Sequence, residues 1–389
     1  MTYCTDCENS TSISRRGFLK ASAILSFAAL PDFALGAANR RTRLVVILMR
    51  GGMDGLFAAP PFGDPSIASL RKHIQPDHYQ KLDNFFSLHP VLGTINDLYQ
   101  KGQALLVHGV SFPYTGRSHF EGQDIMESGI MRAYASPTGW LGRGMDASGF
   151  TPVAMSLPIP LVLRGQKEVA NRYPSWINKP DSSYYKSILP LWTGDPDLAP
   201  VGEKIEASLA DGAGMSAQIY IGDRASFVSL AADAGQRLKL DDGPRVAVLD
   251  YVGFDTHSGQ PGQQSEKLGD VDAAIGLLRQ NLGPVWNDTL VVTVTEFGRT
   301  AAENGSYGTD HGWGSAIFIV GGRLKKSGIV ADWPGLKKSA LFEGRDVKAT
   351  IDARSVYGAV LSAALELDPE RIKKDVLDYK PSPLFESYI

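Results

Sequence analysis

Carboxylate and imidazole side chains recur in two motifs in the second half of the chain. Asp255 and His257 are two residues apart, so in an extended segment both side chains lie on one face and can reach the same ion. Glu296 follows an apolar, β-branched run, and Asp310 and His311 stand in the glycine-rich loop beyond it. Because carboxylates and imidazoles are common ligands of divalent metals, these five residues predict a metal site.

A loop near residue 118 adds groups that are suited to ester chemistry. Ser118 and Thr115 each offer a hydroxyl that can act as a nucleophile, and His119 offers a further metal ligand. Arg117 and Arg299 are candidates for a clamp on an anionic substrate, because one guanidinium binds two oxygens at once. The alternative role of Ser118 is structural, since a helix is predicted to start at residue 118 or 119 and serine is a frequent N-cap.

Asp54 is a further candidate metal ligand. It follows the predicted strand 43–50 and a pair of glycines, which places it just beyond the carboxyl end of that strand. An aspartate at such a place is also a common turn or helix cap. The metal hypothesis therefore depends on all these residues meeting at one edge of a parallel sheet, where open α/β folds bind their ligands.

The elements that would position these residues are read from hydrophobic periodicity. Apolar runs typical of buried strands alternate with segments of helical periodicity, which predicts an α/β fold with a mostly parallel sheet. Strands are expected at residues 43–50, 104–107, 245–251, 291–294 and 315–320, and helices at 91–100, 118–128, 225–238, 266–281 and 354–365. A loop-rich elaboration is predicted at about 133–242, with a turn at 139–143, short strands at 152–156 and 160–163, and a helix at 201–210.

Composition restricts both the partners and the metal. The 389-residue chain has a net charge of -3, which gives no basic surface of the kind that binds nucleic acid. Its two cysteines, Cys4 and Cys7, both precede the predicted mature chain, so oxygen and imidazole groups are left as metal ligands. Zn, Mn, Fe, Mg and Ca all suit such a set.

The N-terminal residues predict export. The pair Arg15-Arg16 precedes a modestly apolar segment at residues 21–30 and then a run of small residues. This order is typical of a cleaved twin-arginine signal, and the apolar segment is too short to span a bilayer. We therefore expect residues 1–38 to be removed and residues 39–389 to form a periplasmic or secreted protein. Its partners would be the twin-arginine export machinery and a small-molecule ester, with no stable membrane anchor.

Several longer motifs resemble those of a known family. The motifs are similar to domain-of-unknown-function family 1501, a family of exported bacterial proteins, and they read GGMDGL, LHPVL, HGVSFPYTGRSHF, GWLGR, DYVGFDTHSGQ, TEFGRTAAENGSYGTDHGWGSAIFIVGG, DWPGL and GRDV. That family in turn resembles a branch of the alkaline phosphatase and sulfatase superfamily. The resemblance implies a three-layer α/β/α sandwich that hydrolyses phosphate or sulfate esters with a nucleophile and paired metals.

The resemblance also implies roles for single residues. Asp54 matches a metal aspartate after the first strand, and the loop of Ser118 matches the nucleophile loop, with Thr115 as the alternative nucleophile. Asp255 and His257 resemble the paired ligands of one metal, and His311 resembles a late histidine ligand.

Two departures from the superfamily pattern restrict the function. Glu296-Phe297 stands where relatives have an Asp-His pair, which puts the second metal site in doubt. Thr115 stands where a sulfatase motif beginning at Ser111 requires arginine. The leading hypothesis is therefore an exported metal-dependent hydrolase of phosphate-type or related esters with Ser118 as nucleophile. The alternatives are a non-catalytic exported binding or assembly protein that retains the fold, and a sulfatase-like esterase.

Overall fold

The chain divides into two compact units. The computed structural model describes residues 41–156, 159–165, 169–171, 182–196, 198–200, 202–203, 206 and 227–389. The first unit comprises Met1–Phe33 and Arg172–Arg224, and the second, the α/β unit, comprises Ala34–Asn171 and Ala225–Ile389. The predicted export signal and most of the helix predicted at 201–210 lie outside the described residues, and helix α7 (Ser182–Trp192) belongs to the first unit. All the candidate site residues belong to the α/β unit.

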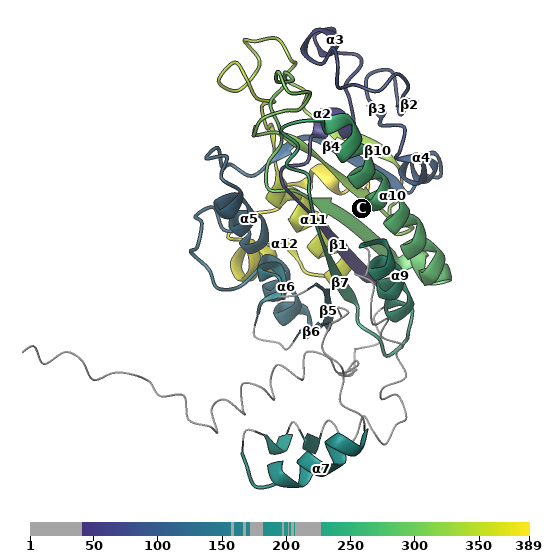
Figure 1. Cartoon of the computed structure of the whole chain (residues 1–389), viewed down its shortest axis with the longest axis vertical. Coiled ribbons are helices and arrows are strands. Elements are labelled where there is room, and N and C mark those ends of the chain that lie inside the picture. The colour runs from purple at the N-terminus through teal and green to yellow at the C-terminus, as the bar shows by residue number, and fades with distance from the viewer. Residues whose placement is uncertain are drawn as a thin grey trace, which may run out of the picture. The chain divides into compact units, whose positions relative to one another are not determined.

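One large sheet forms the middle of the α/β unit (Figure 1). Its strands are β1 (Arg43–Arg50), β4 (Ala104–Ser111), β5 (Pro152–Met155), β6 (Ala170–Asn171), β7 (Val246–Val252), β8 (Thr289–Val294), β9 (Ser315–Val320), β10 (Gly328–Ala331) and β11 (Ile351–Asp352). They follow the order β10-β4-β9-β8-β1-β7-β5-β6, and β11 pairs with the end of β4. Among these described strands β9 alone runs antiparallel to its neighbours, β4 and β8. A small separate sheet pairs β2 (Gln80–Lys81) with β3 (Ser87–Leu88).

Helices cover both faces of the large sheet (Figure 1). Alternate residues of β1 sort into two buried clusters, because successive side chains of a strand point to opposite faces. One cluster also contains residues of α4 (Gly93–Gln100), α9 (Phe227–Leu238) and α10 (Gln260–Leu282), and the other contains residues of α5 (His119–Ser128), α6 (Trp140–Ser148) and α11 (Ala353–Leu365). The predicted three-layer α/β/α class with a mostly parallel sheet is thus confirmed.

Short helical segments complete the described part of the chain. They are α2 (Gly55–Ala58), α3 (Ile67–Leu70), α12 (Pro369–Arg371), the 3-10 segments η1 (Leu161–Leu163), η2 (Gly283–Asp288) and η4 (Pro383–Phe385), and the π-helical η3 (Ile372–Leu377).

Two local predictions were wrong. The turn expected at residues 139–143 is the start of helix α6, and the strand expected at 160–163 is the 3-10 segment η1. A Cβ on Gly139 would lie 2.2 Å from the Leu161 carbonyl oxygen, and one on Gly142 would lie 2.2 Å from that of Arg164. These glycines therefore serve close packing of α6 against the segment around η1, and they do not mark a turn.

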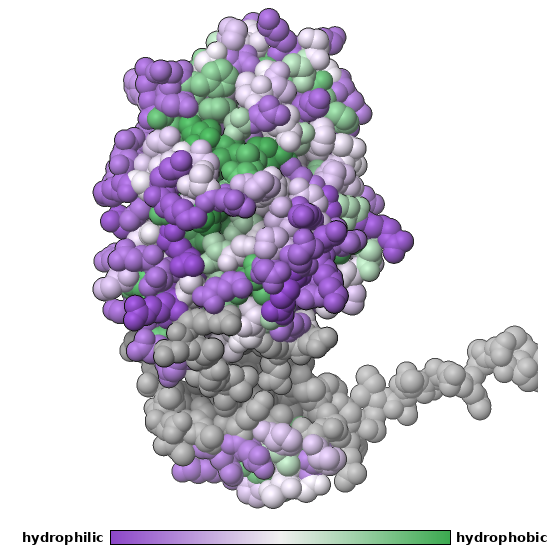
Figure 2. Space-filling model, turned by 180° about the vertical axis from the view of Figure 1, so that it is seen from behind, coloured by the Kyte–Doolittle hydropathy of each residue, from purple (hydrophilic) through white to green (hydrophobic). Residues whose placement is uncertain are grey.

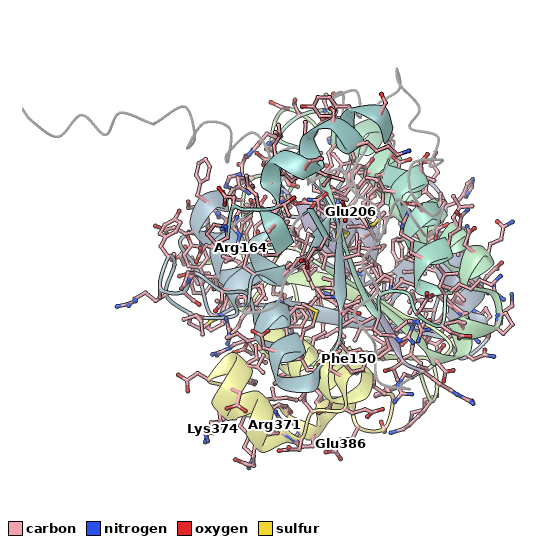
Figure 3. The ribbon with its side chains drawn as sticks, turned by 90° about the horizontal axis from the view of Figure 1, so that it is seen from below. Phe150, Arg164, Glu206, Arg371, Lys374 and Glu386 are labelled. Carbon is pink, nitrogen blue, oxygen red and sulfur yellow. The ribbon has the colours of Figure 1, made fainter. Side chains whose placement is uncertain are left out.

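The surface of the α/β unit is largely polar. Figure 2 shows polar side chains over much of one face, with a hydrophobic stretch in its upper half. Seen from below, Arg371 and Lys374 lie on the C-terminal segment, where both are exposed, whereas Phe150 beyond α6 is buried (Figure 3). Within the described residues, no helix is both long enough and apolar enough to cross a membrane.

Candidate metal centre

Three loops at one edge of the sheet supply the residues of the site. His119 is the first residue of α5 and follows β4, whereas Asp255 and His257 follow β7. His311 lies between β8 and β9, and its backbone forms an antiparallel bridge with that of Arg299. Because β4, β7 and β8 run in one direction and β9 in the other, all these loops lie at the edge formed by the carboxyl ends of the parallel strands.

Four side chains converge there into what we call the His–Asp cluster: His119, Asp255, His257 and His311. The Nε2 atom of His311 is 3.0 Å from Nε2 of His119 and 3.0 Å from Nε2 of His257. Oδ1 of Asp255 is 3.1 Å from Nε2 of His311 and 3.0 Å from Nε2 of His257, and its Oδ2 is 3.3 Å from Nε2 of His119. One ligand atom from each of His119, Asp255 and His311 lies within 4.8 Å of the other two.

The second nitrogen of each ring is held by an acceptor outside the cluster. Nδ1 of His119 is 2.8 Å from Oε1 of Glu296, and Nδ1 of His257 is 3.1 Å from Oδ1 of Asp310. Nδ1 of His311 is 2.9 Å from the backbone oxygen of Arg117. Since carboxylates and carbonyls accept hydrogen bonds, each Nδ1 is the donor, and in a neutral ring the Nε2 lone pair is then directed at the cluster.

This donor set fits a divalent cation. Nε2 of His311 lies about 3 Å from the other two imidazole nitrogens and from the Asp255 carboxylate, and lone pairs so close repel unless a proton or a cation lies among them. Histidine ligands of metals almost always donate their other ring N–H to a carboxylate or carbonyl, as all three rings do here.

Glu296 is a buried acceptor that orients His119. Besides the His119 ring, it accepts the backbone N–H of Gly51 at 2.9 Å, the Gln123 amide at 3.1 Å and the Thr295 hydroxyl at 3.2 Å. Burial raises the pKa of the Glu296 carboxyl, but the hydrogen bonds from His119, Gln123 and Gly51 outweigh it and the net pKa is lowered. Glu296, predicted as a metal ligand, thus lies behind His119, with its oxygens occupied by protein donors.

The pKa values of the cluster shift in opposite directions. The hydrogen bond to Glu296 raises the pKa of His119, whereas burial lowers the pKa of His311. Burial raises the pKa of Asp255, but the hydrogen bond and charge of Arg299 outweigh it and the net pKa is lowered. A proton on Nε2 of His119 and a metal ion would compete for the same place, because a histidine ligand must be deprotonated at the nitrogen that binds the metal.

Asp54 takes no part in the cluster. It is 1% exposed and caps α2 by accepting the backbone N–H groups of Leu56 and Phe57. Its carboxylate also accepts both terminal nitrogens of Arg71, at 2.6 and 3.1 Å, and the Gln260 amide at 2.7 Å.

The loop before α5 contributes no hydroxyl or guanidinium group to the His–Asp cluster. Ser118 is the N-cap of α5 but makes no side-chain cap hydrogen bond, and Thr115 is exposed. The guanidinium of Arg117 is paired with Asp346 at 2.7 Å and with Glu343 at 2.5 Å, so its donors face protein carboxylates. Arg117 reaches the cluster through its backbone carbonyl, with a left-handed φ of 56°.

Two residues near the cluster were not predicted. The ring of Phe297 packs on those of His119 and His311, with centroids 4.9 and 5.2 Å apart. Arg345 donates to the backbone oxygen of His311 and, at 2.7 Å, to Oδ1 of Asp346, while its side chain remains 46% exposed. Both stand in motifs that carry the family resemblance, TEFGRT and GRDV, but neither type is a metal ligand.

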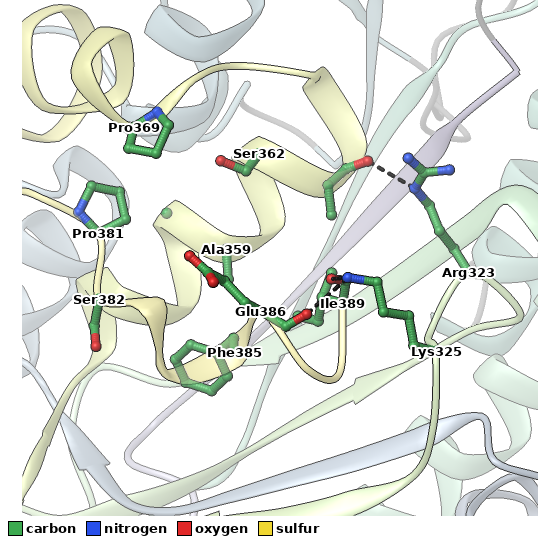
Figure 4. Close-up of a pocket in the computed structure, with 12 residues that line it drawn as sticks. Arg323, Lys325, Ala359, Ser362, Pro369, Pro381, Ser382, Phe385, Glu386 and Ile389 are labelled. Carbon is green, nitrogen blue, oxygen red and sulfur yellow. Dashed lines mark hydrogen bonds between the residues drawn. The ribbon is translucent and has the colours of Figure 1, made fainter.

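A hollow elsewhere in the α/β unit does not contain any of these residues. It has a volume of about 430 Å³ and lies beside α11 (Figure 4). Its two cations are held by backbone oxygens, Lys325 by Glu386 and Ile389, and Arg323 by Ala363.

The fold and the cluster define an α/β sandwich with histidines and a carboxylate gathered at the ends of its parallel strands. Residues 229–376 match the family described as "Protein of unknown function (DUF1501)", which confirms the resemblance over this range.

Solved structures give more distant likenesses. The chain is similar to Ps i-CgsB in complex with k-i-k-neocarrahexaose, with 11% identity, a TM-score of 0.47 and coverage of 90% of this chain and 77% of that one. A protein in the alkaline phosphatase superfamily from Vibrio parahaemolyticus has 10% identity, a TM-score of 0.42 and coverages of 89% and 74%. For the lipoteichoic acid synthase LtaP from Listeria monocytogenes the values are 11%, 0.38, 82% and 74%. No curated protein sequence matches the chain.

Proposed function

We propose that the α/β unit is a metal-dependent hydrolase of phosphate-type or related esters. The observation that carries the proposal is the convergence of three imidazole nitrogens and the Asp255 carboxylate, with every ring held from behind. His119, Asp255, His257 and His311 would hold the metal. A set so rich in imidazole favours Zn, Mn or Fe over Mg or Ca.

The surroundings of the cluster support one metal ion and not two. Two of the carboxylates predicted as ligands are occupied, because Glu296 faces four protein donors and Asp54 faces Arg71, Gln260 and a helix end. The apolar ring of Phe297, which is 1% exposed, lies against two of the ligand rings.

Ser118 is the proposed nucleophile. It directly precedes the ligand His119, and its hydroxyl is free of a capping bond. The Ser118 oxygen forms a bond to phosphorus as the ester P–O bond breaks, and the leaving oxygen takes up the proton that the hydroxyl loses. Water then cleaves the Ser118–phosphorus ester, which restores the hydroxyl and releases the acid. When bound, the metal would polarise the ester and lower the pKa of a nearby hydroxyl.

Negative charge on the substrate would be met by this chain's own donors. The Ser118 side chain does not cap the amino end of α5, whose N–H groups favour an anion. Arg345 is held by Asp346 and by the His311 backbone, yet it is 46% exposed, so it is the arginine best placed to bind a non-bridging oxygen. Arg117 is less available because it pairs with two carboxylates, and Arg299 is less available because its side chain is fully buried against Asp255.

Metal content and turnover test the proposal together. We expect the purified protein, residues 39–389, to contain about one equivalent of Zn, Mn or Fe. We also expect it to hydrolyse an aryl phosphate, phosphodiester, phosphonate or sulfate ester. Ser118→Ala should abolish turnover while the metal is retained, and Thr115→Ala serves as the matched control. If turnover is lost in Thr115→Ala and not in Ser118→Ala, Thr115 is the nucleophile. A folded protein that contains no metal would refute the proposal of a metal-dependent enzyme.

A non-catalytic binding protein is the second candidate. The observation that favours it is that Asp54 and Arg117, two residues expected at a catalytic centre, are used inside the protein. Metal binding without turnover of any of these esters would support it.

The sulfatase-like alternative would require modification of Ser111, which is 5% exposed, and a mass spectrum of the intact chain tests this. Export through the twin-arginine route is part of the proposal for either candidate.

A further inference from the structure

We infer that two buried residues, Thr309 and Gln260, are positioning residues of the His–Asp cluster, and that they act through Arg299 on Asp255. The inference rests on the proposed function, because it concerns the same centre. Neither residue touches the cluster, and neither offers an imidazole or a carboxylate.

A chain of hydrogen bonds connects Asp54 to the cluster. The Gln260 amide donates to Oδ2 of Asp54 at 2.7 Å, and the Thr309 hydroxyl donates to Oε1 of Gln260 at 2.7 Å. Nε of Arg299 donates to the Thr309 hydroxyl at 3.3 Å, and NH1 of Arg299 donates to Oδ1 of Asp255 at 2.7 Å. Asp54, which the sequence predicts as a metal ligand, is thus the final acceptor in this series of hydrogen bonds.

The direction of these bonds is fixed at every member. Because the Asp54 carboxylate only accepts, it must receive the amide N–H of Gln260, which turns the amide oxygen toward Thr309. The Thr309 hydroxyl donates its one proton to that oxygen, so it offers its lone pair to Arg299. Hydrogen bonds aligned in this way polarise one another in a buried site.

The residues of this hydrogen-bond series are buried, whereas Asp255 is partly exposed. The side chain of Asp255 is 42% exposed, whereas that of Arg299 is 0% exposed, and the residues Thr309, Gln260 and Asp54 are 0%, 0% and 1% exposed. NH2 of Arg299 is buried and has no partner among the described residues. The guanidinium is therefore held by two bonds, one to Thr309 and one to Asp255, and loss of the first frees Arg299 and the carboxylate that it orients.

A parallel connection reaches the backbone between two ligands. Gln264, one turn after Gln260 on α10, donates to the backbone oxygen of Asp54 at 3.4 Å and accepts the Thr256 hydroxyl at 3.2 Å. Thr256 stands between Asp255 and His257. Gln264 is 0% exposed like Gln260, and buried amides are costly unless they are hydrogen-bonded, so each glutamine is held by its own connection, Gln260 through Thr309 and Gln264 through Thr256.

The test compares two substitutions of Thr309. Thr309→Val keeps the shape and removes the hydroxyl, whereas Thr309→Ser keeps the hydroxyl. We expect Thr309→Val to weaken Co²⁺ binding by up to about tenfold and to shift the visible absorption of bound Co²⁺, since direct partners of metal ligands typically contribute ten- to a hundredfold and Thr309 acts one residue further away, through Arg299. Thr309→Ser should restore both. Thr289→Val is the control, because Thr289 is also 0% exposed and its hydroxyl donates to Val285 at the opposite end of β8.

The outcomes separate this inference from the proposed function. If Thr309→Val binds Co²⁺ with the affinity and spectrum of the unaltered protein, the positioning role is refuted while the metal centre stands. The role is also refuted if Thr309→Val and Thr289→Val weaken binding equally, since any buried hydroxyl would then do the same. If the unaltered protein binds no Co²⁺, the centre itself is absent.

Discussion

Replacement of Glu296 by glutamine tests the link between the cluster and the buried carboxylate behind it. The substitution preserves shape and most hydrogen bonds. The amide oxygen can still accept from His119, Gly51 and Gln123 in the place of Oε1, and the new NH2 group can donate to the Thr295 hydroxyl in the place of Oε2. The chief loss is the negative charge 2.8 Å from Nδ1 of His119, and the Thr295 hydroxyl also loses the acceptor of its proton.

The expected magnitude is set by the loss of that charge. An anionic acceptor draws the Nδ1 proton outward and makes Nε2 a stronger ligand, and a neutral amide does so less. Loss of a ligand's partner typically weakens metal binding ten- to a hundredfold, which corresponds to about 1.4–2.8 kcal/mol. Because the hydrogen bond itself survives in Glu296→Gln, we expect a value near the lower limit, about tenfold.

A titration of Zn²⁺ or Co²⁺ against a competing chelator measures this change. Glu303→Gln is the matched control, because Glu303 also accepts Nδ1 of a histidine, His73, and two backbone N–H groups, but at a place outside the cluster. Equal affinities for Glu296→Gln, Glu303→Gln and the unaltered protein would refute the reasoning, since His119 would then not depend on the charge behind it.

The same geometry supports three more predictions. In the metal-free protein the hydrogen bond to Glu296 raises the pKa of His119, so its contribution to stability is complete below about pH 6.5 and is lost as the pH rises through the raised value. Urea unfolding should therefore find Glu296→Gln more costly at about pH 6 than at about pH 9. Asp255→Asn removes the one carboxylate paired with the buried guanidinium of Arg299 among the described residues, and because Asp255 itself is 42% exposed, it should cost about 1–3 kcal/mol in the same assay, the range for a buried donor that loses its partner. Arg345→Ala should raise KM for an anionic ester about tenfold with unchanged metal affinity, and unchanged steady-state kinetics would exclude Arg345 from substrate binding.

The framework of the fold could be predicted because its signals are local. The runs that became β1, β8 and β9 are continuous and apolar, as expected for strands covered on both faces, and their bounds agree with the prediction to within two residues. The antiparallel direction of β9 was not predicted, since no local pattern distinguishes it. Helix α6 was missed because its glycines are required by contacts with residues 161–164, which are distant in sequence.

The site could be predicted only as far as residue types allow. Four of the residues proposed as ligands meet in the cluster, because loops at the carboxyl ends of parallel strands gather at one edge of the sheet. The residues that position these four side chains are harder to predict from the sequence. Arg117 acts through its backbone carbonyl, and Thr309 and Gln260 act through Arg299, so their side-chain types give no sign of metal chemistry.

Asp54 and Asp255 show what separates a proposed ligand from a structural acid at the same edge of the sheet. Both come after a parallel strand, and sequence position alone does not distinguish them. A carboxylate has about four lone-pair sites, and Asp54 accepts five hydrogen bonds from Leu56, Phe57, Arg71 and Gln260, so no site remains for a metal. Asp255 accepts one charged donor, Arg299, and its remaining lone pairs face imidazole nitrogens. The number of donors already facing a carboxylate therefore decides its role, and for Asp54 three of the five bonds come from Arg71 and Gln260, which are 17 and 206 residues away in the sequence.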